Sequence, residues 1–426
     1  MRMRMKARWT LGLALAAMVS GGASAAETKA ELPILGWHGM PCHLVTVGRY
    51  AQAKDAGFTH LMQWAPDLKE SLRVLDCAQK AGIRLLLHSP CVDGERLEES
   101  VKALKSHPGL GLYHLCDEPV AAKLPEIGAR AKRIMAADPA HPCYMNWCGV
   151  VGRDPMRWYG APDYRSYIAV SRREVPIQVI SFDKYPLIAD AGKYKEPFRD
   201  LAETSLKTNW FETLEIVREV SRREKVPFWA FAISTAHRIG SNVYFPGGHA
   251  YPTATVAGMR LQQYANLAYG AQGLQYFTYW GVGGNEMNFH DSPFTLDGHE
   301  TFVLDRIRAV NAELQARASV FVGADAKEVW HTGGTIPPFT RRLPGKGLPK
   351  GVRSLEIDGG AIVSHLVNGR NEYLMVVCTE LHRATTFRAA FADGVLRIRT
   401  DGKAVPAKAH VDEYVLEPGD AEIFRL

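Results

Sequence analysis

Short apolar runs alternate with amphipathic segments along the first 280 residues of the chain. Runs that are apolar on both faces are expected to be strands, and they cover residues 34–39, 59–64, 83–89, 111–117, 142–147, 179–186, 227–234 and 274–280. Such runs favour a parallel sheet that is covered on both sides, because a half-exposed strand would alternate apolar and polar residues.

The segments between these runs have the pattern of helices. Segments 46–57 and 68–82 each end in glycine, a common stop residue just past a helix, and 209–225 is clearly amphipathic. Eight strand–helix units in roughly 300 residues predict a (β/α)8 TIM barrel, an α/β fold. A doubly wound open sheet is the alternative, but the residues after the first run, "GWHGMPCHLV", lack the GxGxxG spacing of its phosphate loop.

The pattern changes near residue 325. Short alternating segments separated by Asn-Gly, Asp-Gly and Pro-Gly turns indicate an antiparallel β-sandwich. We therefore predict a catalytic barrel over residues 27–325 and a C-terminal β-sandwich domain over 326–426. Segment 332–351, rich in Gly, Pro and basic residues, is expected to be an exposed loop.

Residues 1–26 have the three parts of a signal peptide. A basic start, "MRMRMKAR", precedes an apolar run that is too short to span a membrane, and small residues end it near Ala25 or Ala26. We expect a secreted or periplasmic protein with no membrane insertion after the leader is removed. A buried N-terminal helix is the alternative.

Composition adds little that is specific. With 46% hydrophobic and 23% charged residues, the chain is typical of a globular protein. Removal of the leader changes 51 basic and 45 acidic residues to 47 and 45, so the formal charge falls from +6 to +2. No nucleic-acid partner is expected from so small a charge. The cysteines are odd in number and scattered, which does not indicate a disulfide framework: Cys42, Cys77, Cys91, Cys116, Cys143, Cys148 and Cys378.

In a TIM barrel the carboxyl ends of the strands carry the active site. The side chains expected there are aromatic rings, imidazoles, amides and carboxylates. Such groups suit a carbohydrate, because rings stack on sugar faces and polar groups bind hydroxyls. The predicted substrate-binding residues are His38, Trp64, His88, Asp117, Asn146, Trp147, Tyr185 and Trp280.

Most glycosidases need two carboxyl groups, one protonated to assist the leaving oxygen and one ionised. Glu118 ends the fourth predicted strand, and the adjacent charge of Asp117 would favour its protonated form. Alternatively, Glu118 could merely cap a helix or pair with an arginine.

The chain resembles the retaining barrel glycoside hydrolases, the β-galactosidase and β-glucosidase superfamily. The resemblance rests on "AGFTHLM", "HPGLGLYHLCDEP", "FDKYP", "LAYGAQGLQYFTYW" and the terminal "PGDAEIFRL", in that order, and it extends to exported bacterial members. It implies that Glu118 is the acid/base residue at the end of strand 4, where that superfamily commonly has Asn-Glu.

One feature departs from that superfamily. Its members place a nucleophilic glutamate at the end of strand 7, whereas segment 232–236 here has no acidic residue. The layout of this sequence offers Asp183 and then Glu286 as the second catalytic carboxylate. The leading hypothesis is a glycosidase that cleaves an oligo- or polysaccharide, with no cofactor and no metal.

Two other functions remain open. A degenerate barrel could bind carbohydrate without cleaving it, as the missing strand-7 acid suggests. A metal-dependent barrel hydrolase is the other, with His38, His88 and His114 as possible ligands. The sequence does not decide the sugar, the stereochemistry or the oligomeric state.

Overall fold

The computed structural model describes residues 30–426 except 153, 190–203, 240–248, 284–286 and 408–411. The predicted signal peptide, residues 1–26, and the candidate Glu286 therefore lie outside the described residues. Among the described helices, none is long and apolar enough to cross a membrane. The seven cysteines are all described and all carry free thiols.

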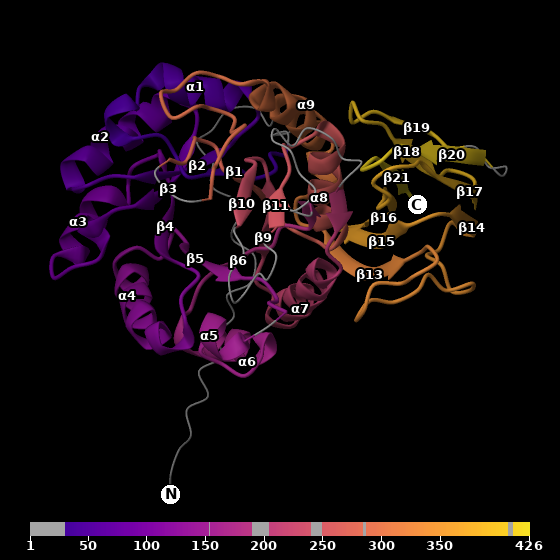
Figure 1. Ribbon diagram of the computed structural model, residues 1–426, viewed down its shortest axis with the longest axis horizontal. Coiled ribbons are helices and arrows are strands. Elements are labelled where there is room, and N and C mark those ends of the chain that lie inside the picture. Colours follow the sequence, from indigo (N-terminus) through magenta and orange to yellow (C-terminus); the bar gives the residue numbers. More distant parts are fainter. Residues whose placement is uncertain (1–29, 153, 190–203, 240–248, 284–286, 408–411) are drawn as a thin grey trace, which may run out of the picture.

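A closed parallel barrel forms the larger part of the molecule (Figure 1). Each described barrel strand pairs with its neighbours in parallel register, and the last pairs with the first, Ile34 opposite Leu274. The predicted TIM barrel is thus confirmed. Its strands, in order around the barrel, are β1 (Ile34–Trp37), β2 (His60–Trp64), β3 (Arg84–His88), β4 (Leu110–Asp117), β5 (Cys143–Cys148), β6 (Val179–Asp183), β9 (Phe228–Ile233) and β12 (Gly273–Phe277).

Helices surround the barrel, and side-chain caps begin several of them. The Asp67 carboxylate accepts a hydrogen bond from the Glu70 N–H at the start of α2, and Gly82 ends that helix with a left-handed φ of 70°. The described helices are α1 (Val47–Asp55), α2 (Leu68–Ala81), α3 (Leu97–Leu104), α4 (Leu124–Ala137), α5 (Pro155–Tyr159), α6 (Tyr164–Glu174), α7 (Asn209–Glu224), α8 (Val256–Ala268), α9 (Phe302–Ala316) and α10 (Ala318–Phe321).

Barrel strands are buried on both faces, which explains their continuous apolar runs. In β3, Leu85 and Leu87 belong to the core beneath the helices, and Leu86 belongs to the core inside the barrel. Short excursions add a small sheet of order β10-β11-β7-β8. Its strands follow barrel strands β6 and β9: β7 (Leu187–Ala189), β8 (Thr204–Leu206), β10 (His237–Ile239) and β11 (His249–Tyr251).

The C-terminal region is a β-sandwich, as predicted. One sheet has the order β13-β15-β16-β21-β18-β19 and the other β14-β17-β20. In β16, Leu374 and Val376 face the second sheet, and Met375 and Val377 face the barrel. Its strands are β13 (Asp325–His331), β14 (Val352–Asp358), β15 (Ala361–Asn368), β16 (Asn371–Cys378), β17 (Thr385–Phe391), β18 (Leu396–Ile398), β19 (Ala404–Pro406), β20 (Asp412–Leu416) and β21 (Ala421–Arg425).

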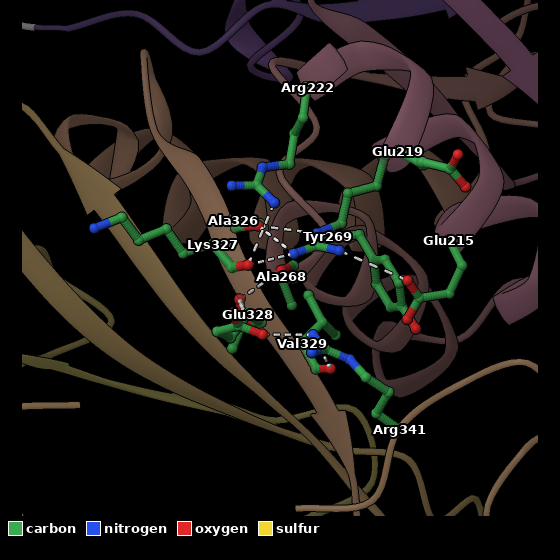
Figure 2. A network of polar contacts seen from close by, with 12 residues as sticks. Glu215, Glu219, Arg222, Ala268, Tyr269, Ala326, Lys327, Glu328, Val329 and Arg341 are labelled. Atoms are coloured by element: carbon green, nitrogen blue, oxygen red, sulfur yellow. Dashed lines mark hydrogen bonds and ion pairs between the residues drawn. The ribbon is translucent and has the colours of Figure 1, made fainter. Parts of the chain in front are cut away.

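The sandwich docks on the barrel through α7 and α8 (Figure 1). We call the polar network at this contact the junction network; it contains Glu215, Arg218, Arg222 and residues of β13, several of which Figure 2 shows. The buried Arg218 guanidinium donates to the carbonyl oxygens of Ala326 (2.9 and 2.6 Å) and Lys327 (2.6 Å). Arg222 pairs with Asp325 at 2.8 Å. The two units are therefore held by hydrogen bonds to charged groups as well as by apolar packing.

Candidate active site

An irregularity in β4 decides which side chains reach the barrel mouth. His114 lies opposite Tyr144 and Asp117 lies opposite Asn146, so three steps on β4 match two on β5. Such a bulge places His114 and Asp117 on the same, inward face, although regular alternation would separate them. The Arg130 guanidinium of α4 donates to the carbonyl of the extra residue, Leu115, which stabilises the bulge.

Glu118 follows in a backbone conformation that is rare for its type. Its φ is 43°, in the left-handed region, and its N–H donates to the Asn146 carbonyl at 3.0 Å. The Tyr167 hydroxyl donates to the Pro119 carbonyl at 2.6 Å and holds the next residue. Strain of this kind is commonly found at functional sites, where the surrounding contacts maintain it.

Asn146 links the carboxylates at the ends of β4 and β6. Its amide nitrogen donates to Asp117 Oδ1 at 3.0 Å and to Asp183 Oδ1 at 3.1 Å. The Ser181 hydroxyl donates to Asn146 Oδ1 at 2.7 Å, and Gln275 Nε2 donates to Ser181 Oγ at 3.0 Å. This chain of donors orients the amide so that its N–H groups face both aspartates.

The side chains of Glu118 and Asp183 share a hydrogen bond. Burial and then the charge of Glu118 hold the pKa of Asp183 well above its usual range. Burial, together with the charge of Asp117, also raises the pKa of Glu118. Two carboxyls in contact cannot easily both ionise, so loss of the second proton from the pair is disfavoured.

Asp117 differs from this pair. Asp117 is exposed at the mouth, but the surrounding protein atoms partly desolvate its carboxyl. This desolvation and then the charge of Asp183 raise its pKa to about 6, and the Asn146 hydrogen bond opposes that rise. Asp117 is therefore mostly ionised at neutral pH, and its side chain is open to solvent. The nearby cation, Lys184, donates to the Val150 carbonyl at 2.6 Å, and burial lowers its pKa.

Imidazoles and tryptophans line another quarter of the mouth. The His114 ring lies 4.6 Å from that of His88 and 5.5 Å from that of Trp37, between ring centroids. Neither ring nitrogen of His114 has a hydrogen-bond partner among the described residues. Trp64 is 48% exposed, and His38, with a φ of 59°, is exposed at the end of β1. Across the described ranges, no group of three His, Cys, Asp or Glu side chains is arranged to hold a metal ion.

Two predicted substrate-binding tryptophans are corrected by the structure. Trp147 is buried under the helices, where its Nε1 donates to Ser171 Oγ at 2.8 Å. Trp280 is buried against Phe294, with ring planes 11° apart and centroids at 5.2 Å. Both rings pack within the protein and offer no face to a sugar. The alternation of side chains along a strand does not predict where Trp280 points, because β12 ends at Phe277.

The end of the seventh barrel strand carries no acid. From Phe228 to Ile239 the described residues include no Asp or Glu, and Ser234, Thr235 and Ala236 are buried.

An aromatic group fills this side of the mouth instead. The Tyr185 ring lies 5.6 Å from both Phe277 and Tyr251, and the His237 ring lies 4.6 Å from both Tyr251 and Phe289. Of these, Tyr185 was among the predicted site residues. Sequence reasoning missed Tyr251, which ends the three-residue strand β11, and Phe289, which lies in a loop, because neither segment has a periodic pattern.

Comparisons with known proteins support the fold. No protein-family model matches the chain, and no curated protein matches it. Among solved structures it is similar to a catalytic mutant of Gan42B, a GH42 β-galactosidase from G. stearothermophilus. That likeness has 8% identity, covers 94% of this chain and 98% of the other, and has a TM-score of 0.59.

A second similar structure is a family 39 glycoside hydrolase from the gut symbiont Bacteroides cellulosilyticus WH2. It shows 12% identity over 93% of this chain and 81% of the other, with a TM-score of 0.50. The chain spans 60% of the length of a β-galactosidase from the psychrophilic Marinomonas ef1, at 12% identity over 67% of this chain and a TM-score of 0.47. Identities this low establish the barrel architecture and nothing finer.

Proposed function

We propose that this protein is a glycosidase that uses Glu118 as its proton donor. The observation that carries the proposal is the convergence of Asp117, Glu118 and Asp183 around Asn146 at the carboxyl ends of β4, β5 and β6. In a TIM barrel, catalytic groups come from this edge. Cleavage of a glycosidic bond needs a carboxyl group that stays protonated near neutral pH, which the coupled pair supplies.

Asp183 is proposed to act with Glu118 rather than across the substrate from it. A nucleophilic carboxylate works at about 5–5.5 Å from the acid, and a base for water at about 6.5–9.5 Å. The shared hydrogen bond places these two groups in contact, which leaves no room for a sugar between them. The pair would then hold one proton between its two carboxyls and deliver it to the leaving oxygen through Glu118. For substrate contacts we propose His38, Trp64, His88 and Tyr185, because each lies at the mouth.

The test is Glu118→Gln, which keeps the shape of the side chain and removes its proton. On a substrate with a poor leaving group, kcat should fall by about 10²–10⁴-fold. The matched control is Glu95→Gln, an exposed glutamate in the loop before α3, which should leave kcat unchanged. Near wild-type activity of the folded Glu118→Gln protein would refute the assignment.

The second candidate is a carbohydrate-binding protein without catalysis. The acid-free end of β9 favours it, because the retaining barrel glycosidases that the chain resembles place their nucleophile there. Calorimetry with a panel of oligosaccharides distinguishes the two, since this candidate predicts heats of binding and no released product. We further propose export through the N-terminal leader and no nucleic-acid partner, on the composition of residues 1–26 and the small charge that remains.

A further inference from the structure

The described mouth offers a proton donor but no separate nucleophile. Glu118 and Asp183 are hydrogen-bonded to each other, so they lie on the same side of any bound sugar, and residues 228–239 at the end of β9 contain no acid. Asp117 is the remaining described carboxylate of the group, and it stands next to the proton donor in the chain. Retention through a protein nucleophile requires a carboxylate on the opposite side of the sugar ring from the acid. Adjacent residues at the end of one strand do not meet that requirement.

Asp117 is well placed for another task. The bulge in β4 turns its side chain into the mouth, and Asn146 Nδ2 holds Oδ1 at 3.0 Å. Asp117 is exposed, and among the described residues Asn146 is the one hydrogen-bond partner of its side chain, so Oδ2 has no partner there. An ionised carboxylate that is fixed at one oxygen and open at the other accepts a hydrogen bond from an N–H group. A neutral hexose offers only O–H donors to it, whereas an acylated amino sugar offers an N–H whose attached carbonyl the same contact would orient.

We infer that the substrate is a 2-acetamido sugar, whose own acetamido group supplies the nucleophile that the described part of the mouth does not. This inference rests on the proposed glycosidase function. Asp117 would accept the acetamido N–H and orient the carbonyl oxygen beneath the anomeric carbon. Substrate-assisted glycosidases form a known exception to the two-carboxylate scheme.

The reaction then runs in two balanced steps. In the first, the acetamido oxygen forms a bond to C1, and the bond from C1 to the leaving oxygen breaks. The leaving oxygen keeps that electron pair and takes the proton from Glu118, while Asp117 stabilises the positive charge on the bicyclic nitrogen. In the second, water adds to C1 and returns its proton to Glu118, and the acetamido oxygen recovers its electron pair. The net change is hydrolysis with retention.

The surroundings of the carboxylates fit this ligand. Tyr185 lies close enough to Asp117, Glu118 and Asp183 for their charges to act on it, and its ring packs with Tyr251 and Phe277. These apolar walls suit an acetyl methyl group. A uronic acid would instead place a further negative charge beside three carboxyls, which is unfavourable.

The experiment compares substrates that differ only at C2. The 4-nitrophenyl β-glycosides of 2-acetamido-2-deoxyglucose and 2-acetamido-2-deoxygalactose are matched with those of glucose and galactose. Attack from the back requires the leaving group to be trans to the acetamido group, so the β anomers are used. We expect kcat/KM to favour the acetamido substrates by on the order of 1,000-fold or more, because the nucleophile is held within the substrate.

A second measurement separates chemistry from recognition. Mono-, di- and trifluoroacetyl substrates weaken the carbonyl nucleophile progressively, so kcat should fall along the series. Asp117→Asn should reduce kcat on the acetamido substrate far more than it changes KM, and Glu95→Gln should do neither.

The possible failures differ from one another. Preferred hydrolysis of the 2-hydroxy glycosides, or a kcat that is indifferent to fluorination, would overturn the inference and leave the glycosidase proposal standing. Absence of turnover on both sets and on a broad oligosaccharide panel would overturn the glycosidase proposal, and the inference with it.

Discussion

Opposite charges are paired in the junction network, whereas like charges lie close together at the barrel mouth. At the junction these described carboxylates each have a cation nearby: Arg218 lies 3.7 Å from Glu215 and Arg222 lies 2.8 Å from Asp325. Beside them, Arg341 lies 2.6 Å from Glu328 of β13 (Figure 2). At the mouth the Asn146 amide bonds two carboxyls, Asp117 and Asp183, and a third, that of Glu118, lies against Asp183. The cation Lys184 acts on Glu118 and Asp183. Matched charges stabilise a contact, whereas crowded like charges raise pKa values and serve chemistry.

The largest expected effect is at the mouth. Asp183→Asn keeps a hydrogen bond to Glu118 but cannot share a proton with it, so the raised pKa of the pair is lost and Glu118 should ionise at a lower pH than the pair does. We expect kcat at pH 7 to drop by about 10²–10⁴-fold and the pH optimum to move lower. A pH–rate profile checks both, and a thermal melt should show no loss of stability. An unchanged optimum would mean that the two carboxyls do not titrate together.

The next effect is at the junction. Arg218→Met keeps most of the side-chain volume and removes the donors to two buried carbonyls and the partner of Glu215. Loss of one partner in such a network should lower the free energy of unfolding by about 3–5 kcal/mol, measured by urea titration. Activity per folded molecule should be retained. A loss of kcat without a loss of stability would contradict the contrast between the two regions.

A smaller effect concerns the pH dependence of stability. The folded pKa of Asp117 is about 6, above its unfolded value, so the folded state holds the proton more tightly. Stability from this group is present below about pH 4 and is lost as pH rises through 6. Asp117→Asn should therefore gain melting temperature relative to wild type as pH increases from 4 to 7.5. Scanning calorimetry at both values tests this, and a constant difference would show that the Asp117 pKa is not raised.

The smallest effect is expected at an exposed pair on the sandwich. Arg388 and Glu413 lie 2.8 Å apart with side chains 63% and 52% exposed. Arg388→Gln should change the free energy of unfolding by no more than about 1 kcal/mol, because water screens the pair. Urea titration beside Arg218→Met provides the comparison. A loss of unfolding free energy as large as that of Arg218→Met would show that burial does not determine how much a charged contact stabilises the fold.

Sequence patterns predicted most of the architecture. Barrel strands that are buried on both sides must be apolar throughout. In the sandwich, successive side chains of a strand point to opposite faces of the sheet, as those of β16 do. The same logic placed Glu118 and Asp183 at strand ends. It failed at Trp147 and Trp280, because proximity to a strand end does not say which way a ring points.

By itself, the sequence determined the barrel, the sandwich and the presence of carboxylates at the ends of two strands, since these depend on local periodicity. Only the tertiary structure decided how the carboxylates meet. The bulge held by Arg130 turns Asp117 inward, the left-handed φ of Glu118 aims its side chain, and Asn146 joins Asp117 to Asp183. Each of these depends on partners 15 to 66 positions away, such as Arg130 for Leu115 and Asp183 for Asp117, and no local pattern encodes contacts of that range.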